Sequence, residues 1–175
     1  MTATVVGLSG SPGQLSRSRT LLELALNALE NQGVAPSRLI DLAQLPAEAL
    51  LGRREATEVR EAIQSVLDAG VLVVATPIYR ATYSGLLKVF LDLLPQDALA
   101  GKVAIPIATG GGPAHLLAVD HGLRAVLASV GALVVATGVY GIDAQFKNGT
   151  PEPALVERIE RAALEAASLA SGVTT

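Results

Sequence analysis

The chain contains no cysteine and no tryptophan, and only 3% of its 175 residues are aromatic. The absence of cysteine excludes disulfides, thiolate metal sites and cysteine nucleophiles, and it fits a protein of the reducing cytoplasm, where we expect this one. Half of the residues are hydrophobic, so the core must consist mainly of alanine, valine, leucine and isoleucine. The length favours a single domain spanning residues 1–175.

Charge is also scarce: charged residues make up 17% of the chain, and the net charge is −3. No lysine or arginine cluster is present, which argues against nucleic acid as a partner. The N-terminus lacks the pattern of a signal peptide, and no apolar run approaches the roughly 18 residues of a membrane span. We therefore expect no membrane association. So apolar a small chain is predicted to bury further surface in a homodimer or homotetramer.

Short apolar runs alternate with helical patterns along the chain. The predicted strands are 3–8, 38–42, 70–75, 102–108 and 132–140. The predicted helices are 18–31, 53–69, 82–94, 115–131 and 152–171, with a loop at 46–52. Strands that are apolar on both faces belong in a parallel sheet covered by helices on both sides. The pattern predicts a doubly wound α/β fold whose five parallel strands take the flavodoxin-like order 2-1-3-4-5.

A serine-rich and glycine-rich loop follows the first predicted strand and leads directly into a helix. Ligands of such folds lie beyond the carboxyl ends of the strands, and the free N–H groups of a helix start favour an anion. The loop therefore predicts a phosphate site formed by Ser11, Ser16, Arg17 and Ser18. The alternative is an ordinary helix cap in a solvated loop. The absence of the GxxxxGK[ST] and GxGxxG patterns argues against Walker-type and dinucleotide-type sites.

Two further loops are predicted to lie at the same edge of the sheet. The loop after the third strand offers a flat apolar surface, and the loop after the fourth strand offers bare glycine backbone. Their candidate binding residues are Pro77, Ile78, Tyr79 and Arg80 in the first, and Thr109, Gly110, Gly111 and Gly112 in the second. Each loop has a structural explanation by itself, as a hydrophobic turn or a flexible connection. Together with the phosphate loop they favour a planar phosphorylated ligand.

Three stretches of the sequence, read together, resemble a known enzyme family. They are "GSPGQLSRS", "ATPIYRATYSGLLKVFLDLLP" and "GKVAIPIATGGGPAHLLAVDHGL". They resemble the NAD(P)H-dependent FMN reductases, in particular the reductase components of two-component alkanesulfonate or methanesulfonate monooxygenases. The resemblance covers about residues 4 to 140.

The resemblance implies a function, cofactors and partners. NADPH or NADH would reduce FMN, and the reduced flavin would pass to a flavin-dependent monooxygenase of organosulfur metabolism. The flavin carries the chemistry, so no catalytic side chain is needed. Two alternatives stay open: an FMN-bound quinone or azo reductase of the same fold, and a flavodoxin-type electron carrier.

The resemblance also assigns roles to the three loops. The first would hold the FMN phosphate, and the other two would line the isoalloxazine ring. For His115 two interpretations remain open: contact with the ring or nicotinamide, or a solvated histidine at a helix start. Some family members carry a tyrosine in a π-bulge where this sequence has His121, so we expect a π-bulge near Asp120 and Gly122. The resemblance places that bulge at a tetramer interface, and the alternative is an irregularity in an ordinary helix.

Overall fold

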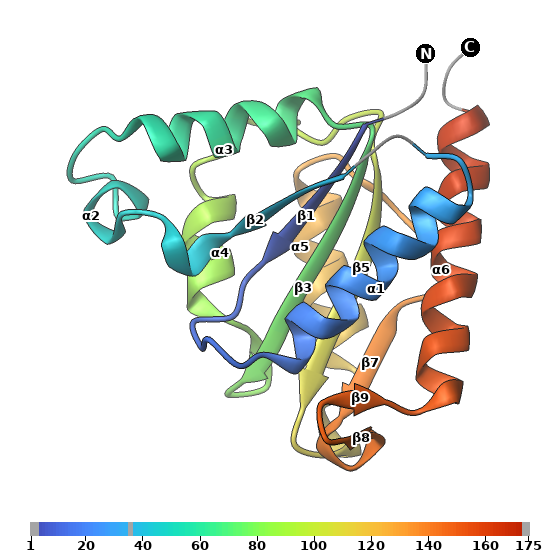
Figure 1. Ribbon diagram of the computed structural model, residues 1–175. Coiled ribbons are helices and arrows are strands. Elements are labelled where there is room, and N and C mark those ends of the chain that lie inside the picture. Colours follow the sequence, from blue (N-terminus) through green and yellow to red (C-terminus); the bar gives the residue numbers. More distant parts are fainter. Residues whose placement is uncertain (1–3, 35–36, 173–175) are drawn as a thin grey trace.

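The structure, a computed structural model, describes residues 4–34 and 37–172, which form a parallel β-sheet between two layers of helices (Figure 1). The strands are β1 (Val5–Ser9), β2 (Ser37–Asp41), β3 (Val71–Tyr79), β4 (Thr82–Tyr83), β5 (Val103–Gly110), β6 (Leu133–Val134), β7 (Val139–Ile142), β8 (Phe146–Lys147) and β9 (Thr150–Pro151). The α-helices are α1 (Arg17–Asn31), α2 (Ala47–Leu50), α3 (Thr57–Asp68), α4 (Gly85–Leu91), α5 (Arg124–Ser129) and α6 (Pro153–Gly172). The 3₁₀ turns are η1 (Leu42–Gln44), η2 (Pro113–His115) and η4 (Asp143–Gln145), and η3 (Val119–Leu123) is a π-helix.

The main sheet has the strand order β2-β1-β3-β5, and β6 and β7 share the position beyond β5. All pairings along this path are parallel. The predicted order 2-1-3-4-5 is confirmed, with the fifth predicted strand present as two pieces. The chain reverses its direction of travel across the sheet between β1 and β3, which is where ligands of doubly wound folds bind.

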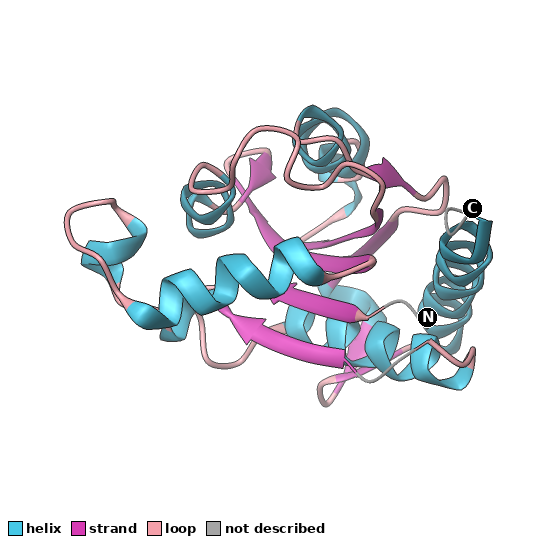
Figure 2. Ribbon diagram, turned by 90° about the horizontal axis from the view of Figure 1, so that it is seen from above, coloured by secondary structure: helices cyan, strands magenta, loops and turns pink. Residues whose placement is uncertain are grey.

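Both faces of the sheet are buried, because strand side chains alternate between the two helical layers. On β3, Leu72 and Val74 pack with residues of α3, α4 and α5. Their neighbours Val71, Val73 and Ala75 pack with residues of α1 and α6. Figure 2 shows the strands between helices on either side. Within the described ranges, no helix is long and apolar enough to span a membrane.

The fifth predicted strand, 132–140, is wrong as a continuous element. The chain pairs with β5 as β6, leaves the ladder and returns as β7. The guanidinium of Arg124 donates to the carbonyl oxygens of residues 134–136, with a shortest distance of 2.6 Å to Val135. The carboxylate of Glu165 accepts from the N–H groups of Ala136 and Thr137 at 2.5 and 2.9 Å. These two side chains satisfy the backbone where the ladder is interrupted.

The predicted helix 115–131 is also not one regular helix. It consists of η2, the π-helix η3 and α5, and the π-helix contains Asp120, His121 and Gly122. The expected π-bulge is therefore confirmed, and His121 is exposed on it. Gly122 packs on β4, since a Cβ at this position would lie 3.0 Å from Oγ1 of Thr82. A larger residue would require the Thr82 side chain to shift.

Other boundaries differ more modestly from the prediction. The predicted helix 82–94 begins at Gly85 and ends at Leu91, because residues 82–83 form β4 instead. The predicted helix 53–69 begins only at Thr57, and the expected loop 46–52 contains the short helix α2. Ala3 of the first predicted strand lies outside the described residues.

Candidate ligand-binding site

An open hollow of about 240 Å³ lies beyond the carboxyl ends of β1, β3 and β5. Its lining comes from all three predicted loops and from one segment that the sequence did not single out. The lining residues are Ser11, Leu15, Ser16, Arg17, Pro77, Ile78, Tyr79, Thr109, Gly110, Gly111 and Asp143. The predicted site residues that do not line it are Ser18, Arg80, Gly112 and His115.

The phosphate loop is organised around the start of α1. Ser16 caps this helix: its Oγ accepts a hydrogen bond from the N–H of Arg19 at 3.2 Å. Ser18 is fully buried, and its Oγ lies 2.9 Å from that of Ser16, within hydrogen-bond distance. It therefore contacts the capping side chain and does not line the hollow. Ser11 is also buried, and its Oγ accepts from the N–H of Gly13 at 3.3 Å. The loop thus presents hydroxyls and a helix N-terminus, a combination suited to an anion.

Arg17 lies on the rim of the hollow and has two partners there. Its Nη1 is 3.0 Å from Oδ1 of Asp143, and its guanidinium lies over the Phe146 ring, 5.7 Å from the centroid. Asp143 immediately follows β7 and therefore reaches the same edge of the sheet as the three loops. Sequence reasoning missed this carboxylate, although its position at the end of the last strand was a usable signal.

The loop after β3 is a tight hairpin. Strand β3 continues through Pro77 to Tyr79 and pairs antiparallel with β4. Arg80 and Ala81 form the connecting turn with φ values of 52° and 68°, a conformation that glycine adopts more easily than other residues. Ile78 is buried while Tyr79 is half-exposed, so the hairpin presents one ring to the hollow and anchors it with its neighbour. Arg80 lies exposed at the tip.

Two buried hydroxyls, those of Thr76 and Ser84, join this hairpin to the phosphate loop. Ser84 Oγ donates to the carbonyl oxygen of Gly10 at 2.5 Å and accepts from the N–H of Leu87 at 3.1 Å, capping α4. The N–H of Ser84 donates in turn to Oγ1 of Thr76 at 2.9 Å. Oγ1 of Thr76 donates to the carbonyl oxygen of Pro77 at 3.0 Å. This chain of hydrogen bonds fixes the two loops relative to each other.

The glycine loop after β5 is held by Tyr140. The hydroxyl of this buried tyrosine donates to the carbonyl oxygen of Gly112 at 2.7 Å. Burial, with a smaller effect of the negative charge of Asp143, raises the pKa of Tyr140. Gly110 has to be glycine because a Cβ there would overlap the Tyr140 hydroxyl.

Gly111 and Gly112 have a different role. A Cβ at either position would meet nothing within 4 Å, and none of these three glycines has a positive φ. Their lack of side chains therefore leaves open space instead of permitting an unusual backbone. Gly111 borders the hollow, which is what a planar ligand lying against the loop requires. His115 lies beyond the loop in η2 and is exposed.

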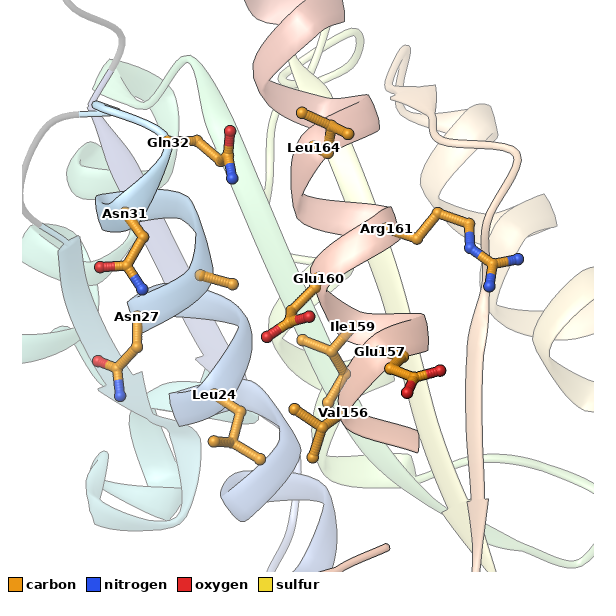
Figure 3. A pocket seen from close by; sticks show the side chains of 11 residues that line it. Leu24, Asn27, Asn31, Gln32, Val156, Glu157, Ile159, Glu160, Arg161 and Leu164 are labelled. Carbon is orange, nitrogen blue, oxygen red and sulfur yellow. The ribbon is translucent and has the colours of Figure 1, made fainter. Parts of the chain in front are cut away.

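A second, larger hollow of about 470 Å³ lies between α1 and α6 (Figure 3). Glu157 and Glu160 of α6 line one side, and Asn27 and Asn31 of α1 line the other. Its lining has two carboxylates and one guanidinium, that of Arg161, so it carries no net positive charge to attract an anion. It also lies against helices and away from the strand ends, where ligands of this fold bind. The smaller hollow at the strand ends is therefore the better candidate for a phosphorylated ligand.

The fold is flavodoxin-like, and the hollow at its strand ends is lined by hydroxyls, a guanidinium and open glycine backbone. Residues 3–147 match the family model of the NADPH-dependent FMN reductases, and the chain belongs to this family.

Individual relatives are consistent with this assignment. The chain is 42% identical over 159 residues to an FMN reductase (NADPH) of Pseudomonas putida, covering 89% of this chain and 80% of the relative. It is 38% identical to the NADH-dependent FMN reductase SfnF of Pseudomonas fluorescens, covering 94% and 90%. Among solved structures, the apo form of an NADH:FMN oxidoreductase, EMOB, superposes with a TM-score of 0.88 at 41% identity, covering 95% of this chain and 89% of that one.

Proposed function

We propose that this chain, an NAD(P)H-dependent FMN reductase by family, binds FMN in the hollow at the strand ends and releases it, reduced, to a partner monooxygenase. The proposed binding site is supported by one observation: a cation, hydroxyls and a helix N-terminus lie in the same hollow as an open glycine backbone. An FMN molecule has the matching parts, a phosphate and a flat ring system. The residues present therefore fit the ligand.

The protein's own groups have binding and positioning tasks. Arg17, Ser11 and Ser16 hold the phosphate, and charge-assisted hydrogen bonds of this kind are among the stronger ones. Ile78, Tyr79 and the Gly111 backbone line the ring. When bound, FMN supplies the hydride acceptor, so the side chains around it need to orient the ring and exclude water. The names of the relatives include both NADPH and NADH as reductants, so both are candidates here.

The site is tested by comparing flavins that differ in the phosphate. NADPH and NADH oxidation is followed with FMN, FAD and riboflavin as acceptors, and dissociation constants are measured by flavin fluorescence. We expect FMN to bind more tightly than riboflavin, and Arg17→Ala to weaken FMN binding about tenfold or more. Riboflavin binding should hardly change in this variant. Equal losses for both flavins would show that Arg17 does not contact the phosphate.

The same preparation tests the partner part of the proposal, whose basis is the similarity to reductases of organosulfur monooxygenase systems. A reductase that supplies a monooxygenase has to exchange its flavin readily. The purified protein should therefore be nearly colourless and should turn over free FMN. A protein that retains FMN through gel filtration and rapidly reduces quinones or azo dyes would instead be an FMN-bound quinone or azo reductase.

A homodimer or homotetramer is also part of this proposal. Leu116, Leu117 and Tyr79 are each more than half exposed near the glycine loop and the hairpin, and such an apolar surface favours association. Light scattering should give a mass above that of one 17.9 kDa chain. Leu117→Glu should lower the mass, whereas Leu51→Glu, at an equally exposed leucine beside α2, should not. A monomer in the wild type would refute this part.

A further inference from the structure

The cation of the proposed phosphate site already has an anion partner within the protein. Arg17 and Asp143 pair at 3.0 Å, and both side chains line the hollow. Each is about half exposed, at 48% and 52%, so the pair is accessible to a ligand. The two residues are far apart in the sequence: one lies in the first turn of α1 and the other in the turn η4 after β7.

The backbone that carries Asp143 is held firmly in place. Oε1 of Gln145 accepts from the N–H of Ile142 at 2.9 Å, which closes the turn η4. Nε2 of the same side chain donates to Oε1 of Glu152 at 2.7 Å, and the N–H of Glu152 donates back to the Gln145 carbonyl at 2.8 Å. The carboxylate of Asp143 is therefore presented to Arg17 from a fixed turn. Phe146, in the following strand β8, contacts the guanidinium from another side.

The position of Arg17 explains why a carboxylate is needed here. A cation in the first turn of a helix is disfavoured by the helix dipole, which favours an anion at this end. Asp143 supplies that anion when no ligand is bound. A phosphate arriving at the same guanidinium has to share or displace the carboxylate.

We infer that Asp143 competes with the FMN phosphate for Arg17 and so keeps the affinity for FMN low enough for the reduced flavin to leave. This inference rests on the proposed phosphate site. It makes Asp143 a specificity-determining residue: it lowers the affinity for FMN without affecting flavins that lack a phosphate. The effect suits an enzyme that has to release its flavin to a partner.

The test is the nearly isosteric variant Asp143→Asn. We expect FMN to bind about two- to fivefold more tightly and to dissociate more slowly, which corresponds to the usual strength of an exposed ion pair. Riboflavin, which has no phosphate, should bind as it does to the wild type. The matched control is Glu23→Gln: it removes the same charge from an ion pair of α1, with Arg19, that lies outside the hollow. This control should leave FMN binding unchanged.

A double-mutant cycle separates competition for Arg17 from simple charge repulsion. In an Arg17→Ala background, Asp143→Asn should no longer tighten FMN binding. The inference is overturned if the gain persists in that background, if riboflavin gains as much as FMN, or if Asp143→Asn alone leaves FMN binding unchanged. A wild type that binds FMN no better than riboflavin would instead overturn the phosphate site itself, and with it this inference.

Discussion

Replacing Ser84 by alanine tests whether one buried hydroxyl holds the two halves of the site together. The hydroxyl is 1% exposed, caps α4 by accepting from Leu87 and donates to the carbonyl oxygen of Gly10. Losing a serine cap costs about 0.5–2 kcal/mol, and leaving a buried carbonyl unpaired costs about 1–3 kcal/mol. Because one atom makes both bonds, the two costs overlap, and we expect a total of about 2–3 kcal/mol.

The assay is thermal unfolding combined with flavin titration. A loss of this size should lower the midpoint of thermal unfolding by about 5–10 °C for a chain of this length. FMN and riboflavin should both bind more weakly, because the phosphate loop and the hairpin lose their connection. Ser84→Gly separates the two bonds: glycine is a tolerable cap, so the loss that remains reports mainly the bond to Gly10.

Ser129→Ala is the matched control, since this exposed hydroxyl also donates to a backbone carbonyl, that of Val126 at 2.7 Å. It should change stability by less than about 0.5 kcal/mol. If Ser84→Ala were no more destabilising than Ser129→Ala, the hydroxyl would not be a structural link. If it were destabilising but left flavin binding intact, its role would be confined to the helix cap.

Three further substitutions test other parts of the structure. Tyr140→Phe removes the bond to Gly112, so it should weaken FMN and riboflavin binding alike and cost about 1 kcal/mol of stability; a selective loss for FMN in titrations would contradict this. Gly111→Val should weaken flavin binding at least about tenfold with little change in thermal midpoint, because the side chain enters the hollow without backbone strain. Burial alone would raise the pKa of Glu165, but the N–H groups of Thr137 and Ala136 and the charge of Arg124 outweigh it, so the pKa lies below the ordinary value of a glutamate. The stability that this carboxylate contributes is therefore complete above about pH 4.5 and is lost as the pH falls through the folded-state pKa. Glu165→Gln should be less stable than the wild type by about 1 kcal/mol at pH 7, and unfolding curves of the two should converge in acid.

The order of strands and helices, and the edge of the sheet where the loops meet, could be predicted from the sequence. Those features depend on local hydrophobic patterns and on the rules that join parallel strands, both of which can be read along the chain. A helix cap in the serine-rich loop could be anticipated from its composition, although the structure assigns it to Ser16, and the π-helix around His121 could be anticipated from the family resemblance.

How the loops are held depends on contacts between residues far apart in the sequence. Arg17 meets Asp143, and Tyr140 meets Gly112, because the sheet brings the carboxyl ends of separate strands to one edge with specific spacings. The interruption of the fifth strand depends on Arg124 and Glu165, which approach its backbone from two different helices. A local pattern can mark a single residue, as the strand end marks Asp143, but it does not show which distant residue will be the partner.

The hairpin after β3 shows the same limit. Arg80 and Ala81 adopt positive φ values, although neither residue type favours them. Turn chemistry read from the sequence predicts no such turn here. The conformation is maintained because β4 pairs with β3 on one side and packs against the π-helix on the other. These tertiary contacts offset the local backbone strain. The turn could therefore not be predicted from the local sequence.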